Sequence, residues 1–307
     1  MITYKELATV EGELGIPLKT LYSVSNNVNA HYRRVLIPKK DGTYRNLSVP
    51  DAPLKRIQRA INEKLLVYEP ISRYATAYRI ASGIRNNALP HIGMPKVLKL
   101  DIKGFFDSVT YSLVKERVFR KEKYSEPVRV LLTILCYYKD VLPQGAPTSP
   151  VITNIVMREF DEVIGEWCGK KGIAYTRYCD DMTFSGDFDE KEVKAFVAGE
   201  LKKQGFFLNA QKTVVATAAK RQTVTGVVVN KKANVSSEYR REIRKEVFFC
   251  QKYGVAEHIE RLGLDVDTKN YLRKLLGRIN YVLQISPDDG VFQGYKNAVT
   301  EMLANER

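Results

Sequence analysis

The spacing of apolar residues predicts a chain that begins with mixed strands and helices and ends with helices alone. Apolar and polar residues alternate over 32–49 as in a β-hairpin, with a turn at Lys40-Asp41-Gly42. The pattern changes to a helical period over 53–68 and to a short, mostly buried strand over 97–102. Two further helices are predicted, at about 111–121 and 126–138.

The second half of the chain is predicted to alternate helices and strands before the helical end. A helix follows the loop 142–148, with Ser149 as its N-cap and Pro150 as its first helical residue. Tyr178–Asp181 form a hairpin tip, because β-prone stretches flank them on both sides. The remaining elements are expected to be a helix near 189–204, short strands around 206–208, 213–216 and 224–229, and helices from about Ser237 onward.

Length and composition indicate a globular protein with a substantial core. The 307 residues suffice for one large domain or two to three smaller ones, and 44% of them are hydrophobic. No run of about 18 uncharged apolar residues predicts a membrane span, and the N-terminus lacks the apolar segment of a signal peptide. The four cysteines lie far apart without a C-x-x-C pair, which argues against zinc and disulfides and favours a reducing, cytoplasmic location.

The net charge of +14 indicates a polyanionic partner. Such an excess attracts nucleic acid and releases its counterions, although a merely soluble basic protein is the alternative. One basic cluster comprises Arg33, Arg34, Lys39, Lys40, Arg45, Lys55, Arg56 and Arg59. A second lies between Lys231 and Arg278 and includes Arg240, Arg241, Arg244, Lys245, Arg273 and Lys274. Because the clusters flank paired acids, we predict a nucleic-acid enzyme.

Three acidic residues stand at the ends of predicted strands. Asp180 and Asp181 are adjacent at the hairpin tip, and Asp101 ends the apolar strand at 97–102. Adjacent carboxylates repel each other unless a cation lies between them, so the pattern favours a divalent metal site. Three carboxylates from two strands can hold two Mg²⁺ ions about 4 Å apart, an arrangement that catalyses phosphoryl transfer. Acids that merely cap turns are the alternative.

Phe105 and Phe106 follow Asp101 closely. An aromatic ring five residues after the acid can lie under the sugar of an incoming nucleotide and exclude a 2′-hydroxyl by its size. We expect one of the two rings to pack in the core and Phe106 to take the sugar position. Core packing of both rings is the alternative.

Three segments resemble the metal, template and active-site motifs of reverse transcriptases in order and spacing. They are Val97–Val109 (VLKLDIKGFFDSV), Leu142–Pro150 (LPQGAPTSP) and Tyr178–Asp181 (YCDD). Two shorter elements, Asn87–His91 and Val224–Gly226, resemble markers of bacterial retron reverse transcriptases. The similarity covers most of the chain, from about residue 44 to residue 229.

The resemblance implies an α+β right-hand polymerase fold. Residues 1–95 would form the fingers with an N-terminal helical extension. Residues 96–229 would form the palm, with an antiparallel sheet and a helical fingers-side insertion at about 111–141, and residues 230–307 a helical, RNA-binding thumb. The chain departs from the pattern at Tyr78-Arg79, where relatives often have Gly-Phe, and at Cys179, where Ala is more usual.

The resemblance also implies roles for individual residues. The catalytic, metal-binding carboxylates would be Asp101, Asp180 and Asp181, with the Ile102 carbonyl as a further metal ligand. Substrate binding would involve Arg45 at the triphosphate, Phe106 at the sugar, Gln144 and Gly145 at the nucleotide and template base pair, and Lys212 at the pyrophosphate. For Arg45 and Lys212, a solvated surface position is the alternative.

RNA recognition is implied for residues outside the catalytic motifs. Asn87 and His91 would be recognition or scaffold residues. Val224, Thr225 and Gly226 would form a strand-edge element near the thumb, where glycine permits close backbone approach. An RNA stem would be gripped through its phosphates and A-form shape by Arg240, Arg241, Arg244 and Lys245.

The motifs and the resemblance together predict an RNA-directed DNA polymerase, a nucleotidyltransferase that uses dNTPs and two Mg²⁺ ions. Retron enzymes reverse transcribe a cognate structured non-coding RNA into msDNA, primed from the 2′-hydroxyl of an internal guanosine. They commonly act in anti-phage defence with a separate effector protein, and no membrane partner is expected. The alternatives are another bacterial reverse transcriptase, of the group II intron or diversity-generating type, and a non-catalytic RNA-binding module. The three carboxylates argue against the module, since clustered charge is costly where it has no use.

Overall fold

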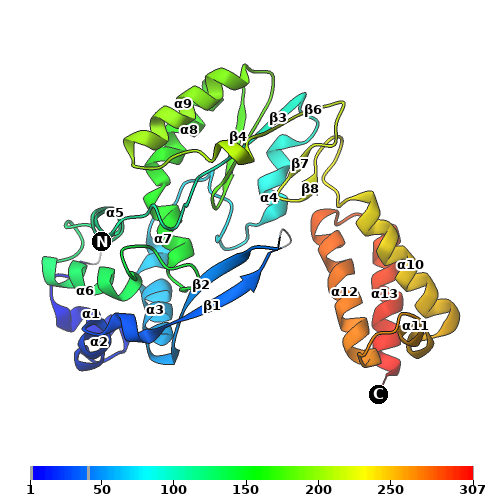
Figure 1. Ribbon diagram of the computed structural model, residues 1–307, viewed down its shortest axis with the longest axis horizontal. Helices are drawn as coiled ribbons and strands as arrows, with labels where there is room; N and C mark the ends of the chain where they lie inside the picture. The colour runs from blue at the N-terminus through cyan, green and yellow to red at the C-terminus, as the bar shows by residue number, and fades with distance from the viewer. Residues whose placement is uncertain (1–2, 40–41, 307) are drawn as a thin grey trace. The chain divides into compact units, whose positions relative to one another are not determined.

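The structure is a computed structural model that describes residues 3–39 and 42–306 and divides into two compact units (Figure 1). The first unit comprises the chain up to Gly83 together with Leu98–Val215. The second comprises Ile84–Val97 and the chain from Ala216 onward. Helices and antiparallel strands occur together, so the chain is α+β as predicted. Within the described residues, no helix is long and apolar enough to cross a lipid bilayer.

The N-terminal part of the first unit combines short helices with a β-hairpin. Its elements are α1 (Leu7–Leu14), α2 (Leu18–Ser25), the 3-10 helix η1 (Val28–His31), β1 (Tyr32–Pro38), β2 (Tyr44–Pro50), α3 (Ala52–Lys64) and the 3-10 helix η2 (Leu66–Tyr68). Antiparallel pairing of Tyr32 with Pro50 confirms the predicted hairpin, whose turn residues Lys40 and Asp41 lie outside the described residues. The Asp51 carboxylate caps α3, the predicted helix, by accepting a hydrogen bond from a backbone N–H.

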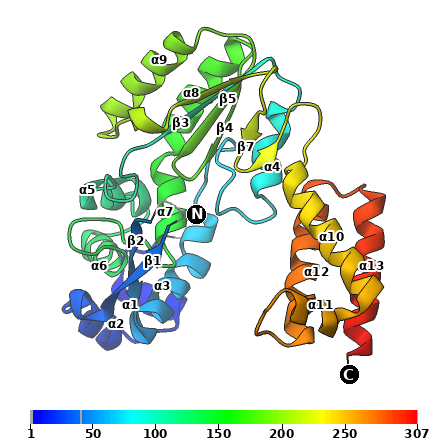
Figure 2. The same cartoon turned by 45° about the vertical axis from the view of Figure 1, so that its right-hand side comes forward.

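Most of a four-stranded sheet, in the order β4-β5-β3-β6, belongs to the first unit. Its strands are β3 (Lys96–Asp101), β4 (Ala174–Tyr178), β5 (Asp181–Ser185) and β6 (Val214–Thr217). Two helices, α8 (Arg158–Lys170) and α9 (Glu190–Lys203), lie beside this sheet (Figure 2). Phe160 of α8, Val197 of α9 and Phe184 of β5 are buried in one core. Because β3 neighbours β5, the sheet brings the strand-end acids together.

The segment between β3 and β4 is helical as predicted, with one correction at a helix start. Its elements are α5 (Tyr111–Leu113), the π-helix η4 (Val114–Val118), α6 (Glu126–Cys136) and α7 (Ser149–Val156). The predicted N-cap was wrong by one residue, because α7 begins at Ser149 and Thr148 holds the N-cap position. The Ser149 hydroxyl instead donates to the Pro143 carbonyl at 2.7 Å, which ties the preceding loop to the helix.

Two of the predicted short strands were also wrong in detail. Residues 206–208 contribute only an isolated antiparallel bridge between Leu208 and Ile102. Residues 224–229 are not one strand, because they belong to the hairpin of β7 (Thr223–Val224) and β8 (Val227–Val228). Its turn residues Thr225 and Gly226 have φ of 46° and 83°, the left-handed conformation that two-residue hairpin turns require. The strand predicted at 213–216 corresponds to β6, which follows the 3-10 helix η5 (Ala210–Lys212).

The second unit combines the β7–β8 hairpin with helices. These are α4 (Ile84–Ala88), the 3-10 helix η3 (Leu89–His91), α10 (Ser237–Tyr253), α11 (Val255–Arg261), α12 (Thr268–Ile285) and α13 (Gly290–Asn305), which confirms the predicted helical end. Val247, Leu275 and Phe292, from the three long helices, share a buried core with Val97 and Val224. This unit therefore has a hydrophobic core of its own.

Candidate active site

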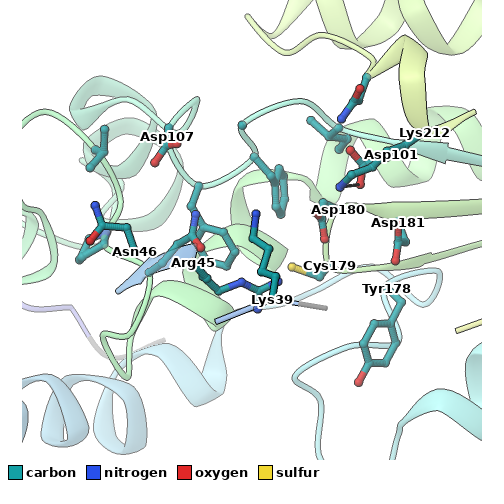
Figure 3. Close-up of a pocket in the computed structure, with 18 of the residues that line it drawn as sticks. Lys39, Arg45, Asn46, Asp101, Asp107, Tyr178, Cys179, Asp180, Asp181 and Lys212 are labelled. Atoms are coloured by element: carbon teal, nitrogen blue, oxygen red, sulfur yellow. Dashed lines mark hydrogen bonds and ion pairs between the residues drawn. The ribbon is translucent and has the colours of Figure 1, made fainter. Parts of the chain in front are cut away.

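A cavity of about 630 Å³ in the first unit collects most of the residues predicted for the site (Figure 3). Its walls come from the β1–β2 hairpin, the end of β3 with the segment after it, the loop before α7 and the β4–β5 turn. The predicted residues that line it are Arg45, Asp101, Ile102, Phe106, Gln144, Asp180, Asp181 and Lys212. Segments far apart in the sequence thus meet around one space.

The turn between β4 and β5 carries the paired acids. Its two residues are Cys179, with a left-handed φ of 61°, and Asp180, and β5 begins at Asp181. The N–H of Ile102 donates to the Asp180 carbonyl at 3.1 Å. This hydrogen bond fastens the turn to the end of β3, so Asp101 and the paired acids lie at one edge of the sheet.

The three carboxylates influence one another. Desolvation by the surrounding protein raises the pKa of Asp181 to about 6, and the negative charges of Asp180 and Asp101 add to the rise, although the side chain keeps contact with solvent. The Lys212 ammonium forms an ion pair with Oδ2 of the buried Asp101 at 2.8 Å. This hydrogen bond is the main cause of a raised pKa for Lys212. Clustered negative charge of this kind is what a bound cation relieves.

The donor atoms suit a hard divalent cation, because all three acids offer oxygen ligands. The bridge between Ile102 and Leu208 is formed by the carbonyl of Asp101 and the N–H of Lys103, so it does not use the Ile102 carbonyl. Across residues 3–39 and 42–306, no three His, Cys, Asp or Glu side chains lie close enough to share one ion. The positive charge that balances the Asp101 carboxylate in this structure is the ammonium of Lys212.

Beneath the turn lies a buried ion pair that the sequence analysis missed. Arg177 and Asp161 are both 0% exposed, and Arg177 donates to the two carboxylate oxygens at 2.8 and 2.6 Å. Nη1 of Arg177 donates to the Cys179 carbonyl at 2.8 Å, and the Tyr175 hydroxyl donates to Asp161 at 2.8 Å. The network therefore supports the backbone of the turn. A lone charged residue, Arg177, in a strand of otherwise uncharged residues was the signal that could have revealed it.

Phe105 and Phe106 divide between core and cavity as predicted. Phe105 is 3% exposed and packs near Phe206, whereas Phe106 stays partly exposed at the cavity. The Phe106 carbonyl accepts a hydrogen bond from the N–H of Leu142 at 3.3 Å, which joins this residue to the loop before α7. The role of Phe106 at the sugar stays a prediction.

Gln144 and Gly145 lie against β2. The carbonyl of Gln144, a cavity residue, accepts from the N–H of Ser48 at 2.7 Å. Gly145 has φ of 116°, and a Cβ atom there would lie 3.0 Å from the Ser48 carbonyl oxygen. Glycine is needed where two backbones approach this closely. Unlike Gln144, Gly145 is not among the residues that line the cavity.

The hairpin side of the cavity is basic. Arg45 on β2 and Lys39 after β1 are exposed, and both side chains extend into the cavity (Figure 3). Lys39 was part of a predicted basic cluster but was not predicted as a substrate residue. Positive side chains opposite three carboxylates suit a ligand that carries phosphates and binds metal.

Comparison with known proteins agrees with these motifs. The profile of the family described as reverse transcriptase (RNA-dependent DNA polymerase) matches residues 37–244. The retron Ec86 reverse transcriptase of Escherichia coli is 32% identical to this chain, over 84% of this chain and 83% of its own length. The chain belongs to the retron reverse transcriptases.

Further comparisons place this retron reverse transcriptase among its relatives. The retron Ec83 reverse transcriptase of Escherichia coli is 36% identical, over 80% of this chain and 81% of its own length. A solved structure of apo telomerase from Candida tropicalis is more distant, at 14% identity and a TM-score of 0.48, over 67% of this chain and 55% of that one. Family membership confirms the predicted right-hand polymerase fold and RNA-directed DNA polymerase activity. Enzymes of this family generally use divalent metal ions, which the oxygen donors of the cavity fit.

The two retron marker elements contact each other in the second unit. Nδ2 of Asn87 donates to Oγ1 of Thr225 at 3.3 Å. Asn87, His91 and Val224 are 0% exposed, whereas Thr225 is half-buried and Gly226 is exposed. Burial lowers the pKa of His91 to about 4, so the ring is neutral at pH 7. Of the two roles predicted for Asn87 and His91, burial favours the scaffold.

The basic residues predicted to recognise RNA separate into two groups on α10. Arg241, Arg244 and Lys245 are exposed. Arg240 is instead partly buried, because it forms an ion pair with Asp289 at 2.6 Å and lies 4.5 Å from the centre of the Phe292 ring. Arg240 therefore joins α10 to α13.

The end of α10 carries an aromatic group that the sequence analysis also missed. Phe248 is 52% exposed, and the Lys252 ammonium lies 5.6 Å from its ring centre. The Arg261 guanidinium lies 4.0 Å from the ring centre of Tyr253. An exposed aromatic ring beside a cation, as at Phe248, suits the stacking of unpaired bases. The feature of the sequence that could have revealed this group is the presence of aromatic residues within a basic helix.

Proposed function

We propose that this retron reverse transcriptase copies a cognate structured RNA into msDNA, primed from the 2′-hydroxyl of an internal guanosine. The proposal is carried by one observation, the convergence in one cavity of the three carboxylates, the partly exposed Phe106 and three basic side chains. The names of the two retron relatives support it. The product would be a branched RNA–DNA made from dNTPs, in anti-phage defence with a separate effector protein. Four free, buried cysteines support a cytoplasmic location.

Asp101, Asp180 and Asp181 would hold two Mg²⁺ ions. When bound, these ions lower the pKa of the primer hydroxyl and neutralise charge on the leaving pyrophosphate. The chain's own residues orient the substrate around this centre. Arg45 binds the triphosphate, and Lys212, ion-paired to Asp101, has an ammonium proton to donate to pyrophosphate.

Phe106 would lie under the sugar, with its ring held by the packing of Phe105 behind it. Gln144 and Gly145 would contact the nucleotide and the template base pair, since their loop is hydrogen-bonded to β2. The Ile102 carbonyl would complete the oxygen ligands of one ion. These roles follow from the resemblance and from the side chains that line the cavity.

We assign the domains on the same basis. Residues 1–95 would be the fingers, 96–229 the palm with its insertion at about 111–141, and 230–307 the thumb. The four-stranded sheet supports the palm assignment, and helices α10 to α13 support the thumb. RNA phosphates would be bound by the exposed residues Arg241, Arg244 and Lys245 of α10, with Arg240 as a structural residue behind them.

Branched priming is tested on nucleic acid extracted from cells that express the chain with its own RNA gene. We expect a small DNA whose electrophoretic mobility changes after RNase treatment, because RNA is covalently attached to it. Debranching by an enzyme that cleaves 2′–5′ linkages should release the same DNA. A DNA product that neither treatment changes would contradict priming from an RNA 2′-hydroxyl.

Replacing Phe106 by Ala is expected to raise rNTP incorporation relative to dNTP, because removal of the ring opens space for a 2′-hydroxyl. Primer extension should show the ratio of kcat/KM for rNTP over dNTP rising by about tenfold or more. Phe207→Ala is the matched control, since this ring is 58% exposed and does not line the cavity. An unchanged ratio in Phe106→Ala would assign the sugar gate to another residue.

A further inference from the structure

Tyr78 contacts Cys179, a residue of the catalytic turn. The hydroxyl of Tyr78 donates a hydrogen bond to Sγ of Cys179 at 3.4 Å. This hydrogen bond needs both side chains, because it joins a phenolic hydroxyl to a thiol sulfur.

The backbone explains why residues so far apart in sequence meet. The N–H of Arg177 donates to the Tyr74 carbonyl at 2.8 Å, and the N–H of Thr76 donates to the Arg177 carbonyl at 2.9 Å. The segment before Tyr78 thus runs parallel to β4, as the bridge between residues 75 and 177 also shows. Two to three residues further along both segments, Tyr78 lies beside Cys179.

Both residues adopt an unusual backbone conformation. Tyr78 has φ of 56° and Cys179 has φ of 61°, the left-handed region that side-chain-bearing residues rarely occupy. A bulky residue keeps this conformation only where its surroundings hold it. Tyr78 is 47% exposed and lines the active-site cavity, so burial of the ring alone does not hold it. Its hydrogen bond to Cys179 is a specific restraint.

We propose that Tyr78 is a positioning residue for catalysis, whose hydroxyl holds Cys179 and thereby the backbone from which Asp180 and Asp181 project. This inference rests on the proposed function. The backbone of the turn is already fastened on two sides, by Arg177 at the Cys179 carbonyl and by Ile102 at the Asp180 carbonyl. The hydrogen bond from Tyr78 restrains the side chain of Cys179 as well.

The test is steady-state primer extension on an RNA template with Tyr78→Phe, Cys179→Ala and the double variant. Each single variant is expected to lower kcat about fivefold, equivalent to about 1 kcal/mol, with the KM for dNTP changed by less than about twofold. The double variant should be no slower than either single variant, because both remove the same hydrogen bond. Cys179→Ser keeps an acceptor and should stay within about twofold of the unsubstituted chain.

Tyr68→Phe is the matched control, because this tyrosine is 74% exposed in the same unit. Thermal unfolding of each variant separates loss of rate from loss of fold. A normal kcat in Tyr78→Phe, equal kcat in the Ala and Ser variants of Cys179, or a double variant slowed by the product of the two single effects would each overturn the inference. A change in KM alone would also overturn it, since it would mean that Tyr78 acts on the substrate.

These failures differ from failure of the proposed function. If the unsubstituted chain and Tyr68→Phe make DNA while Tyr78→Phe is equally active, only the positioning role is lost. If the unsubstituted chain, loaded with its RNA, makes no DNA, the polymerase mechanism is contradicted and the positioning role with it.

Discussion

DNA synthesis is expected to fall by about a thousandfold or more when Asp180 or Asp181 is replaced by Asn, while RNA binding survives. The amide keeps the shape of the carboxylate but removes the charge that holds a divalent cation. The fold should be retained, because desolvation and the neighbouring acids Asp180 and Asp101 already raise the pKa of Asp181 to about 6. Removing one of these mutually repelling charges lowers the electrostatic repulsion in the folded state.

This prediction is measured by primer extension with Mg²⁺ and by the amount of RNA that co-purifies with each variant. Asp187→Asn is the matched control, since Asp187 is exposed just beyond β5 and does not line the cavity. Near-normal DNA yield from both Asp180→Asn and Asp181→Asn would end the metal assignment. Loss of RNA binding together with synthesis would indicate a misfolded chain rather than a missing ligand.

The second large effect is expected at Asp161, which lies outside the cavity. Asp161→Asn should lower the free energy of unfolding by about 3–5 kcal/mol, because it leaves the Arg177 guanidinium charged and unpaired in a site that is 0% exposed. Activity should fall as well, since Arg177 also donates to the Cys179 carbonyl of the catalytic turn. Denaturant unfolding at pH 7 gives the free energy.

Two variants make this measurement decisive. Glu166→Gln removes an exposed charge from the same helix, α8, and should change the free energy of unfolding by less than about 0.5 kcal/mol. The double variant Asp161→Leu with Arg177→Met removes both charges and should be less destabilised than Asp161→Asn. A loss below about 1 kcal/mol in Asp161→Asn would mean that water or another group compensates the arginine.

Much of the fold could be predicted from the sequence, because periodicity records local structure. The hairpin at 32–49 and the helix near 189–204 match β1–β2 and α9. The prediction was wrong where a tertiary contact changed a local preference. Ser149 has the chemistry of an N-cap, yet its hydroxyl bonds to the Pro143 carbonyl. Leu208 lies in an apolar stretch that predicted a strand. The place beside β3 is taken by β6, however, and Leu208 forms only an isolated bridge with Ile102.

The sequence by itself determined the chemistry of this protein. Three acids at strand ends, a phenylalanine after the first and a basic chain indicated a metal-dependent polymerase of nucleic acid, and the motifs indicated its family. These properties depend on residue type and short spacing, which a linear chain records completely.

Only the tertiary structure decided which polar residues are solvent-accessible and which are structural. It buried Asn87 and His91, paired Arg177 with Asp161, and brought Tyr78 to Cys179. Burial and pairing of this kind arise when separate segments pack together, whether 16 residues apart as for Arg177 and Asp161 or 101 apart as for Tyr78 and Cys179, and no local pattern records which segments will meet. The carboxylates were visible in the sequence because their chemistry is local, whereas the groups that hold them in place appeared only when the chain was folded.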